Sequence, residues 1–319
     1  MKQRGQKKTF FSLRKRLFLI LIVSFFIGII AYCSNGSKPD FVWSMVNVNH
    51  TALQGDAHLI EVNHGKTILI DAGYLGPASE QLVPYLKNRN VDQIDIAFIT
   101  HPHRDHYEGL IPVLESGITI KTVFFNIPDR SICDREIPWG CNYGQILEYH
   151  QFLNQKGVTI QVAVPGMVFD LGNDVQIKIL YAFDGINTPV GQTDINDMSL
   201  IMMLAHSGRK ILFTGDLNRG IGGYLAEATN IQADILKVPH HGVEGVAPNS
   251  FFERVSPKYG LVPAPEAIWC SARGSRVRNW FQDNKIPVFV NGVHGHIEVM
   301  LYGDEIEFLP ETPNAVVCR

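Results

Sequence analysis

The sequence predicts a layered α/β domain that follows an apolar N-terminal segment. Three observations lead to this prediction. Short β-branched runs alternate with helix-length segments from Phe41 onward, polar residues follow several of these runs, and residues 17–33 form one uninterrupted apolar stretch. The chain has 319 residues, of which 45% are hydrophobic and 18% charged. This composition excludes a disordered or fibrous protein, and the length allows a large buried core.

The apolar stretch 17–33 predicts a membrane anchor. It has the length of a short membrane-spanning helix or of the hydrophobic region of a secretory signal, and three basic residues at 14–16 precede it. Such a basic flank stays in the cytoplasm, so we expect a single-pass membrane protein with its larger part on the extracytoplasmic side. Tyr32 stands where a lipoprotein signal needs a small residue before Cys33. A lipoprotein or a cleaved, secreted form is therefore the less favoured alternative.

The predicted organisation has two parts. Residues 1–38 form a cytoplasmic basic segment, the anchor and a linker, and residues 39–319 form the functional domain. The first part holds eight of the 28 basic residues and no acidic residue, which leaves 20 basic against 31 acidic residues in the second. Such an acidic domain lacks the electrostatic signature of a general nucleic-acid binder.

The chain contains five cysteines. Cys133 and Cys141 lie in one predicted loop and either pair in an oxidising compartment or stay as two free thiols. Cys270 and Cys318 receive no assignment. No two cysteines form a CxxC pattern, so a zinc site built on thiolates is not expected.

The alternating pattern predicts the individual elements. Strands are expected at residues 42–48, 58–62, 67–70, 94–100, 123–126, 158–162, 175–181, 199–204, 210–214, 234–238, 259–262, 288–290 and 297–301. Helices are expected at 79–88, 107–114, 143–155, 222–228, 249–255 and 275–284. This mixture predicts two sheets with helices on their outer faces.

The strongest functional signal is the segment HPHRDH, which directly follows the apolar run IDIAFIT. Its four side chains able to bind a metal are His101, His103, Asp105 and His106. A tight turn at the end of a strand aims such side chains into one cavity, and a mixed nitrogen and oxygen set suits zinc or manganese. Solvated loop histidines are the alternative, which the density of the segment disfavours.

Three further apolar runs end in the same way. Asp71 ends the run TILID, and Asp216 follows ILFTG. His240 and His241 follow the run ILKVP. Each of these alone is an ordinary junction between a strand and a turn. Because they accompany the histidine-rich segment, we expect all of them to converge on one site.

These motifs resemble the metallo-β-lactamase superfamily, and in part its competence-protein (ComEC-like) branch. The matching segments are HxHxDH at 101–106, TGD at 214–216 and PHHG at 239–242 for the superfamily, and QGDA at 54–57 and NDMSL at 196–200 for the branch. The resemblance covers roughly residues 42–302. It implies an αββα sandwich that binds two divalent metal ions, with zinc expected and manganese as the alternative.

The resemblance also implies the ligands of the two ions. His101 and His103 would hold one ion, and Asp105 and His106 would hold the other. Asp216 would bridge the two ions. Asp105 is expected to take part in catalysis as well as in metal binding.

Three assignments stay open. Either His240 or His241 completes the second metal site, and the other contacts the substrate or donates a proton; the working assignment makes His240 the ligand and His241 catalytic. Asp197 stands near the position where many members carry a further histidine, and it either replaces that ligand, which would favour manganese, or lies outside the site. His294, near the C-terminus, either binds an anion or shuttles a proton as a catalytic residue, or belongs to a structural turn.

Four lesser features have simpler expectations. His206 is expected at the surface. Glu108 is expected as a first-turn helix carboxylate favoured by the helix dipole, or as an acceptor for a ligand imidazole. The three arginines within 273–278 form either a phosphate-binding patch or a solvated helix face. The long loop 127–142 is expected to lie over the cleft and to help select the substrate.

The resemblance implies a metal-dependent hydrolase, and two adjacent metal ions suit a phosphodiester that is attacked by a metal-bridging hydroxide. The expected substrate is DNA or a small or lipid-linked phosphodiester. The alternatives are an ester, lactone or β-lactam hydrolase of the same fold and a non-catalytic binding domain. The membrane is expected as a partner through the anchor, and no stable protein partner is expected.

Overall fold

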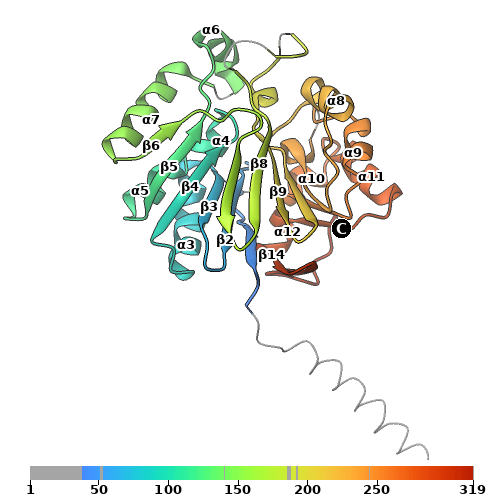
Figure 1. The fold of residues 1–319 in the computed structure, drawn as a ribbon. Helices are drawn as coiled ribbons and strands as arrows, with labels where there is room; N and C mark the ends of the chain where they lie inside the picture. Colours follow the sequence, from blue (N-terminus) through green and yellow to red (C-terminus); the bar gives the residue numbers. More distant parts are fainter. Residues whose placement is uncertain are drawn as a thin grey trace, which may run out of the picture. The chain divides into compact units, whose positions relative to one another are not determined.

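The structure is a computed structural model that describes residues 38–50, 53–139, 141–184, 188–191, 193–243 and 245–318. The range Pro39–Arg319 forms one compact unit. Two sheets lie face to face in this unit, and helices cover the outer face of each sheet (Figure 1). The predicted αββα sandwich is therefore confirmed.

The first sheet, counted over the described residues, has eight strands in the order β15-β14-β1-β2-β3-β4-β5-β6. Its strands are β1 (Phe41–Met45), β2 (Ala57–Val62), β3 (Thr67–Ala72), β4 (Gln93–Ile99), β5 (Thr119–Phe125), β6 (Thr159–Gln161), β14 (Ile297–Tyr302) and β15 (Glu305–Pro310). Neighbouring strands run antiparallel from β15 to β3 and parallel from β3 to β6.

The second sheet has seven strands within the same described ranges, in the order β13-β12-β11-β10-β9-β8-β7. Its strands are β7 (Val168–Gly172), β8 (Val175–Tyr181), β9 (Ile201–His206), β10 (Arg209–Phe213), β11 (Ile235–Lys237), β12 (Tyr259–Val262) and β13 (Val288–Val290). It is antiparallel from β7 to β10 and parallel from β10 to β13. Each sheet thus has a parallel half, whose carboxyl-terminal strand ends are the usual place for a site in α/β folds.

The helices and helical turns connect these strands. They are α2 (Leu75–Pro77), η1 (Ala78–Leu82), α3 (Val83–Asn88), α4 (Arg104–Tyr107), α5 (Leu110–Glu115), α6 (Arg130–Cys133), η2 (Asp134–Trp139), α7 (Tyr143–Gln155), η3 (Asn196–Met198), α8 (Arg219–Ala228), η4 (Pro239–Gly242), α9 (Asn249–Val255), α10 (Glu266–Trp269), α11 (Ser275–Asp283) and α12 (Asn291–His294). In Figure 1, α3, α5 and α7 lie on one side of the sandwich and α8, α9 and α11 on the other.

The core consists of three apolar layers. The layer between the sheets contains large side chains from both, among them Trp43, Phe98 and Phe213. Side chains that point outward from each sheet pack against its own helices, as Leu69 and Leu212 do. Where both faces of a parallel strand are buried, as in β3 and β12, the sequence is mostly an apolar run without alternation. This is why the apolar runs of the sequence located the strands.

Most element predictions agree with the structure. Helices α7 and α9 have the predicted bounds, and so do strands β8, β12 and β13. The predicted helix 107–114 was wrong in its extent, because the chain forms two short helices, α4 and α5, in that region. Strands β7 and β15 were not predicted. Both alternate between exposed and partly buried positions, so they lack the continuous apolar run that marks the inner strands.

The structure assigns four of the cysteines. Cys133 and Cys141 form a disulfide, which resolves the alternative left open by the sequence. Cys270 and Cys318, which the sequence did not assign, form a second disulfide. The predicted anchor, residues 17–33, lies outside the described residues. Among the residues that are described, no helix combines the length and apolar character needed to cross a membrane.

Candidate metal centre

The first group of site residues follows strand β4. This strand ends at Ile99, and the turn after it carries His101 and His103 before the single-turn helix α4 begins. Helix α4 then presents Asp105 and His106. All four side chains are buried, although charged and imidazole side chains prefer solvent. Their burial requires partners within the site.

The second group comes from the other sheet. Asp216 follows β10 through Gly215, which has a φ of +48° and lies so close to Ser199 that a Cβ atom would be 2.6 Å from its Oγ. The Ser199 hydroxyl accepts a hydrogen bond of 2.8 Å from the Asp216 backbone N–H. His241 follows β11 in the turn η4, with a φ of +52°. Both residues therefore reach the site through tight, left-handed turns at strand ends. Glycine adopts this conformation readily, whereas His241 is strained in it, as residues at functional sites often are.

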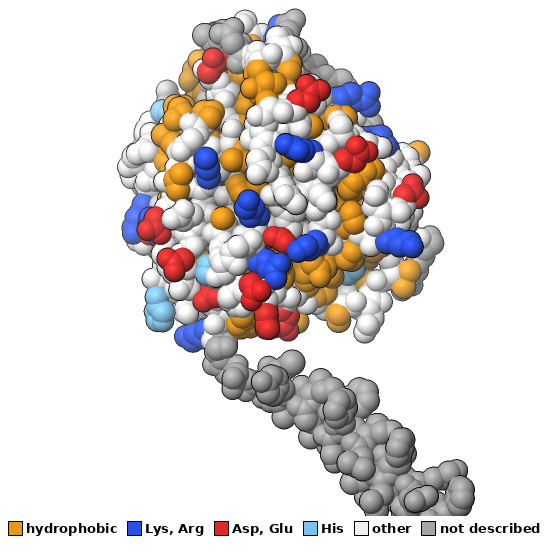
Figure 2. Space-filling model, turned by 45° about the vertical axis from the view of Figure 1, so that its right-hand side comes forward, with side chains coloured by type: hydrophobic (Ala, Val, Ile, Leu, Met, Phe, Trp, Pro, Cys, Tyr) orange, Lys and Arg blue, Asp and Glu red, His pale blue; other side chains and the backbone are white. Residues whose placement is uncertain are grey.

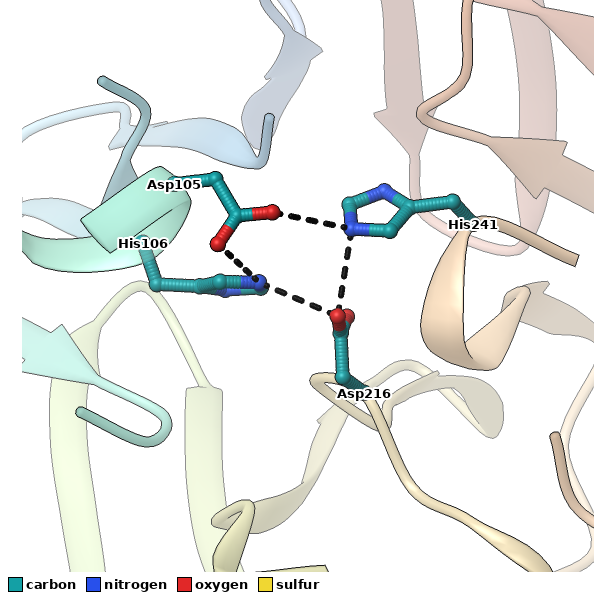
Figure 3. Close-up of side chains that lie close together, drawn as sticks. All are labelled: Asp105, His106, Asp216 and His241. Carbon is teal, nitrogen blue, oxygen red and sulfur yellow. Dashed lines mark ion pairs between the residues drawn. The ribbon is translucent and has the colours of Figure 1, made fainter. Parts of the chain in front are cut away.

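These two groups form a compact set of donors, Asp105, His106, Asp216 and His241, which we call the buried cluster. Figure 3 shows the four side chains turned toward one another. The His241 Nε2 atom lies 3.1 Å from Asp216 Oδ2 and 3.6 Å from Asp105 Oδ2. The His106 Nε2 atom lies 3.3 Å from Asp216 Oδ2 and 4.0 Å from Asp105 Oδ1. One ligand atom of each residue lies within 4.8 Å of all the others, a spacing that fits a single metal ion.

His101 and His103 form a second set, which we call the histidine pair. The Nε2 atom of His101 lies 3.1 Å from the Nδ1 atom of His103. The pair adjoins the buried cluster, since the rings of His101 and His106 have centroids 4.1 Å apart. The six residues of HxHxDH, TGD and PHHG that surround this region thus supply two neighbouring donor sets.

Asp71 fixes the orientation of His106. Its carboxylate accepts hydrogen bonds of 2.8 Å from both the backbone N–H and the hydroxyl of Thr100, and it lies 2.8 Å from His106 Nδ1. A carboxylate at Nδ1 leaves Nε2 of the same ring for a metal ion. Asp71 itself has a φ of +55°, so it too is held in a strained backbone conformation.

A buried ion pair between Lys237 and Asp56 lies next to the cluster, and the sequence did not predict it. Lys237, on β11, is 1% exposed and pairs with the equally buried Asp56. Its ammonium also donates a hydrogen bond of 2.7 Å to the Gly215 carbonyl and lies 3.7 Å from Asp216 Oδ1. Burial raises the pKa of Asp56, but the Lys237 charge together with His58, His241 and His106 outweighs burial, and the net shift of this pKa is downward. A lysine inside an apolar strand was the signal that could have located this pair.

The charges within the cluster are strongly linked. Burial lowers the pKa of His106, but the Asp216 and Asp71 carboxylates outweigh it and raise this pKa well above its ordinary value. Burial also opposes protonation of His241, yet Asp216 and Asp105 raise its pKa to about 10. Without a cation, protons on the His106 and His241 imidazoles therefore balance the negative charge of the carboxylates, which stay ionised. A bound metal ion would release these protons, so its affinity should rise with pH.

The donor atoms fit a divalent metal. The atoms His106 Nε2, His241 Nε2 and Asp216 Oδ1 are buried and make no hydrogen bond with any described residue. Buried polar atoms without partners are uncommon in proteins and call for an explanation. Two imidazoles and two carboxylates are a suitable ligand set for zinc or manganese.

The structure places three other predicted site residues outside the buried cluster. The Asp197 carboxylate accepts hydrogen bonds from the backbone N–H groups of Asn218 (2.9 Å) and Ile221 (3.4 Å), so it caps helix α8. His240, the working choice for the ligand, has its Nδ1 atom 2.7 Å from Asn218 Oδ1, and His241 occupies the cluster instead. His294 is buried with its Nδ1 atom 3.0 Å from the backbone of Val290.

Several lesser predictions are corrected. His206 was wrongly expected at the surface; it is 6% exposed and lies 3.0 Å from Asp40. Glu108 pairs with Arg104 one helical turn earlier, which neither proposed role included. Arg276 and Arg278 donate hydrogen bonds to backbone carbonyls, so they hold neighbouring loops together and are not simply solvated.

The comparisons with known proteins agree with this geometry. Residues 50–121 match the model of the metallo-β-lactamase superfamily. The ComE operon protein 3 of Bacillus subtilis (strain 168) is 25% identical over 228 residues, which cover 66% of this chain and 27% of the relative. The metallo-β-lactamase fold protein YhfI from Bacillus subtilis has a TM-score of 0.51 at 13% identity, covering 79% of this chain and 96% of YhfI. A diphosphatase of the PhnP family has a TM-score of 0.45 at 11% identity, covering 82% and 98%.

The chain therefore has the metallo-β-lactamase fold. The family model matches residues 50–121, which include the HxHxDH segment, and the likeness to YhfI supports the fold of the whole domain. The match to the ComE operon protein 3 spans about a quarter of that relative's length, 27%, so what the whole relative does is not carried over to this chain.

Proposed function

We propose that the protein is a binuclear metal-dependent phosphodiesterase anchored in the membrane, with its catalytic domain on the extracytoplasmic side. The observation that carries the proposal is the buried cluster beside the histidine pair, two adjacent sets of nitrogen and oxygen donors. Divalent cations held there would supply Lewis acidity and a water of lowered pKa for attack on phosphorus. Zinc is the favoured ion and manganese the alternative.

The residues of this chain have separate tasks in the proposed reaction. Asp216 lies against both imidazoles of the buried cluster, and its charge also acts on His101 of the histidine pair, so we assign it to both donor sets. Asp105 and His241 complete the deeper set, and Asp71 keeps His106 in the required orientation. His240 lies beside Asn218 at the edge of the site, where it is placed to hold a proton near a leaving group.

A cavity beside the cluster supports a substrate of modest size. Its volume is about 670 Å³, which is in the range of small-molecule sites. Arg219 and Arg135 line it together with Asn218 and three acidic residues, Glu136, Asp194 and Asp197. The Arg219 guanidinium suits a phosphate of the substrate, and the carboxylates favour a substrate of low negative charge. Arg135 and Glu136 belong to the segment 127–142, in agreement with the expectation that it lies over the cleft.

The charge distribution favours a small or lipid-linked phosphodiester over DNA. Residues 39–319 carry 20 basic against 31 acidic residues. On the face shown in Figure 2, basic and acidic side chains are interspersed and do not gather into one basic tract. Tight binding of a long nucleic acid depends on many contacts between basic residues and phosphates. A short phosphodiester needs few such contacts.

The two disulfides support the extracytoplasmic location. Cys133–Cys141 and Cys270–Cys318 are bonds that persist in oxidising compartments and are rare in the cytoplasm. Together with the basic flank and the apolar stretch 17–33, they favour a domain outside the cytoplasm. In intact cells, external protease should then degrade the domain, whereas degradation only after lysis would reject this topology.

The decisive experiment combines metal analysis with a substrate panel. The full-length chain, purified in detergent, should contain two equivalents of zinc or manganese and hydrolyse bis(p-nitrophenyl) phosphate. Removal of metal with a chelator should abolish turnover, and added zinc or manganese should restore it. DNA, nitrocefin and an acyl-lactone complete the panel. Turnover of nitrocefin or the lactone with none of a phosphodiester would select the alternative hydrolase class, and the absence of bound metal would select a binding domain.

A further inference from the structure

The four imidazoles of the two donor sets are supported unequally. In three of them, one ring nitrogen faces the site and the other has a partner. Nδ1 of His106 lies 2.8 Å from Asp71, Nδ1 of His241 lies 2.7 Å from the carbonyl of Pro263, and Nδ1 of His101 lies 3.1 Å from the Thr100 hydroxyl. In His103 the roles of the two ring nitrogens are exchanged, and the nitrogen that points away from the site has no hydrogen bond with a described residue.

In His103, the Nδ1 atom faces the site, since it lies 3.1 Å from His101 Nε2. The opposite atom, Nε2, is buried and has no hydrogen-bond partner among the described residues. The Oε2 atom of Glu136 lies 3.7 Å from it, and the two form an ion pair when His103 is protonated. This distance between Nε2 and Oε2 is longer than that of a normal hydrogen bond by less than about 1 Å. Hydrogen bonds of this kind are often long before a site is fully assembled.

Glu136 is held in this place by the chain around it. Its Oε1 atom accepts a hydrogen bond of 3.0 Å from the backbone N–H of Ile195. Its own carbonyl accepts one of 3.4 Å from the backbone N–H of Cys141. The buried disulfide between Cys133 and Cys141 closes the short segment that contains Glu136. Three separate constraints thus aim one carboxylate at the histidine pair.

We propose that Glu136 is a positioning residue for His103, and that the Cys133–Cys141 disulfide places its carboxylate. A metal-binding imidazole normally donates its other N–H to a carboxylate or carbonyl, which fixes the tautomer and the ring orientation. With Glu136 at Nε2, the proton of His103 stays on that atom and Nδ1 is left as the metal ligand. The inference rests on the proposed metal site and adds that the histidine pair depends on the oxidised segment.

The test measures metal binding and the tautomer of His103, so it does not depend on turnover. In the full-length protein, Glu136→Ala should lower the affinity for the second metal equivalent, the ion bound by the histidine pair. A chelator competition should show a loss of about tenfold to hundredfold. The first equivalent, bound by the buried cluster, should keep its affinity. In the metal-free protein, long-range ¹H–¹⁵N spectra should show the Nε2–H tautomer of His103 in the wild type and a mixture in Glu136→Ala. Glu136→Gln retains an acceptor oxygen and should give an intermediate result.

Two matched controls separate positioning from a general effect. Asp134→Asn removes a carboxylate that pairs with Arg130 on the same segment, and it should change neither readout. The pair Cys133→Ser/Cys141→Ser should reproduce the loss of Glu136→Ala, and adding Glu136→Ala to it should weaken binding little further. The pair Cys270→Ser/Cys318→Ser should leave the second equivalent unchanged.

Two results would overturn the inference. One is wild-type affinity for both equivalents with an unchanged tautomer in Glu136→Ala. The other is an equal loss in Glu136→Ala and Asp134→Asn. A protein that binds two ions as described but hydrolyses no phosphodiester would reject the proposed function and leave the role of Glu136 standing.

Discussion

The two donor sets of the site differ in how they are anchored. The buried cluster takes Asp105 and His106 from helix α4, and Asp216 and His241 from the turns after β10 and β11 of the other sheet. The histidine pair comes from one short turn, and the nearest carboxylate beyond His103 belongs to the segment 134–139 at the cavity. One set is thus fixed by the strands of two sheets, and the other by a turn and a disulfide-closed segment.

The segment HPHRDH thus contributes to two metal-binding sets that are organised to different degrees. A site held by strand ends and packed side chains is organised before the ion arrives, and such organisation strengthens binding. The histidine pair depends in addition on the segment 134–139, so we expect it to be less well organised before the ion arrives. We therefore expect the buried cluster to fill first and the histidine pair to fill second.

The largest expected effect separates the two sets directly. Asp216→Ala should remove both ions and lower phosphodiester hydrolysis by at least about 10³-fold, because its carboxylate lies against His106 and His241 and its charge also acts on His101. His103→Ala should remove only the second equivalent. Metal content per chain, measured by mass spectrometry, distinguishes the outcomes, with circular dichroism as the check on folding. Loss of both ions in His103→Ala would mean that the two sets do not bind independently.

The next effect concerns stability and tests the anchoring of the cluster. Lys237→Met leaves the buried Asp56 carboxylate without its cation and should lower the free energy of unfolding by about 3–5 kcal/mol in urea denaturation. Lys258→Met is the matched control, because Lys258 pairs with Asp234 while its side chain is 60% exposed. An exposed pair contributes about 1 kcal/mol or less. Adding Asp56→Asn to Lys237→Met should restore part of the loss; similar losses in both lysine variants would contradict a buried ion pair.

Much of this site was predictable because its signals are local. The segment HPHRDH carries four donors in six residues, and Asp216 and His241 follow apolar runs whose ends meet at one edge of the sandwich. The αββα class followed from the same apolar runs. The edge strands β7 and β15 escaped prediction because one face of each is exposed, so their pattern is weaker.

The remaining features depend on contacts that sequence spacing does not encode. The pairing of Asp56 with Lys237 joins two distant segments, and Glu136 stands alone in a loop whose path the disulfide determines. The choice between His240 and His241 rests on the left-handed turn of η4, which points adjacent imidazoles in different directions. Asp197 was expected near the ligands because of its place before β9, whereas its carboxylate turns to the start of α8.

Asp197 yields the smallest expected effect, a pH dependence that belongs to neither donor set. Burial, with the nearby Asp194 charge, raises the pKa of Asp197 from 3.8 to about 7, although backbone N–H groups of α8 oppose the shift. Between these values the folded state holds a proton that the unfolded chain has lost, so the free energy of unfolding should fall as pH rises from about 4 to 7. Asp197→Asn should remove this slope. The change in the free energy of unfolding over this range should be about 2 kcal/mol, because each pKa unit is worth at most about 1.4 kcal/mol and water in the cavity screens part of the interaction. Urea denaturation in the presence of a chelator measures the slope, and Asp283→Asn at an exposed position is the control. An equal slope in wild type and Asp197→Asn would show that the carboxylate stays charged as the cap of α8.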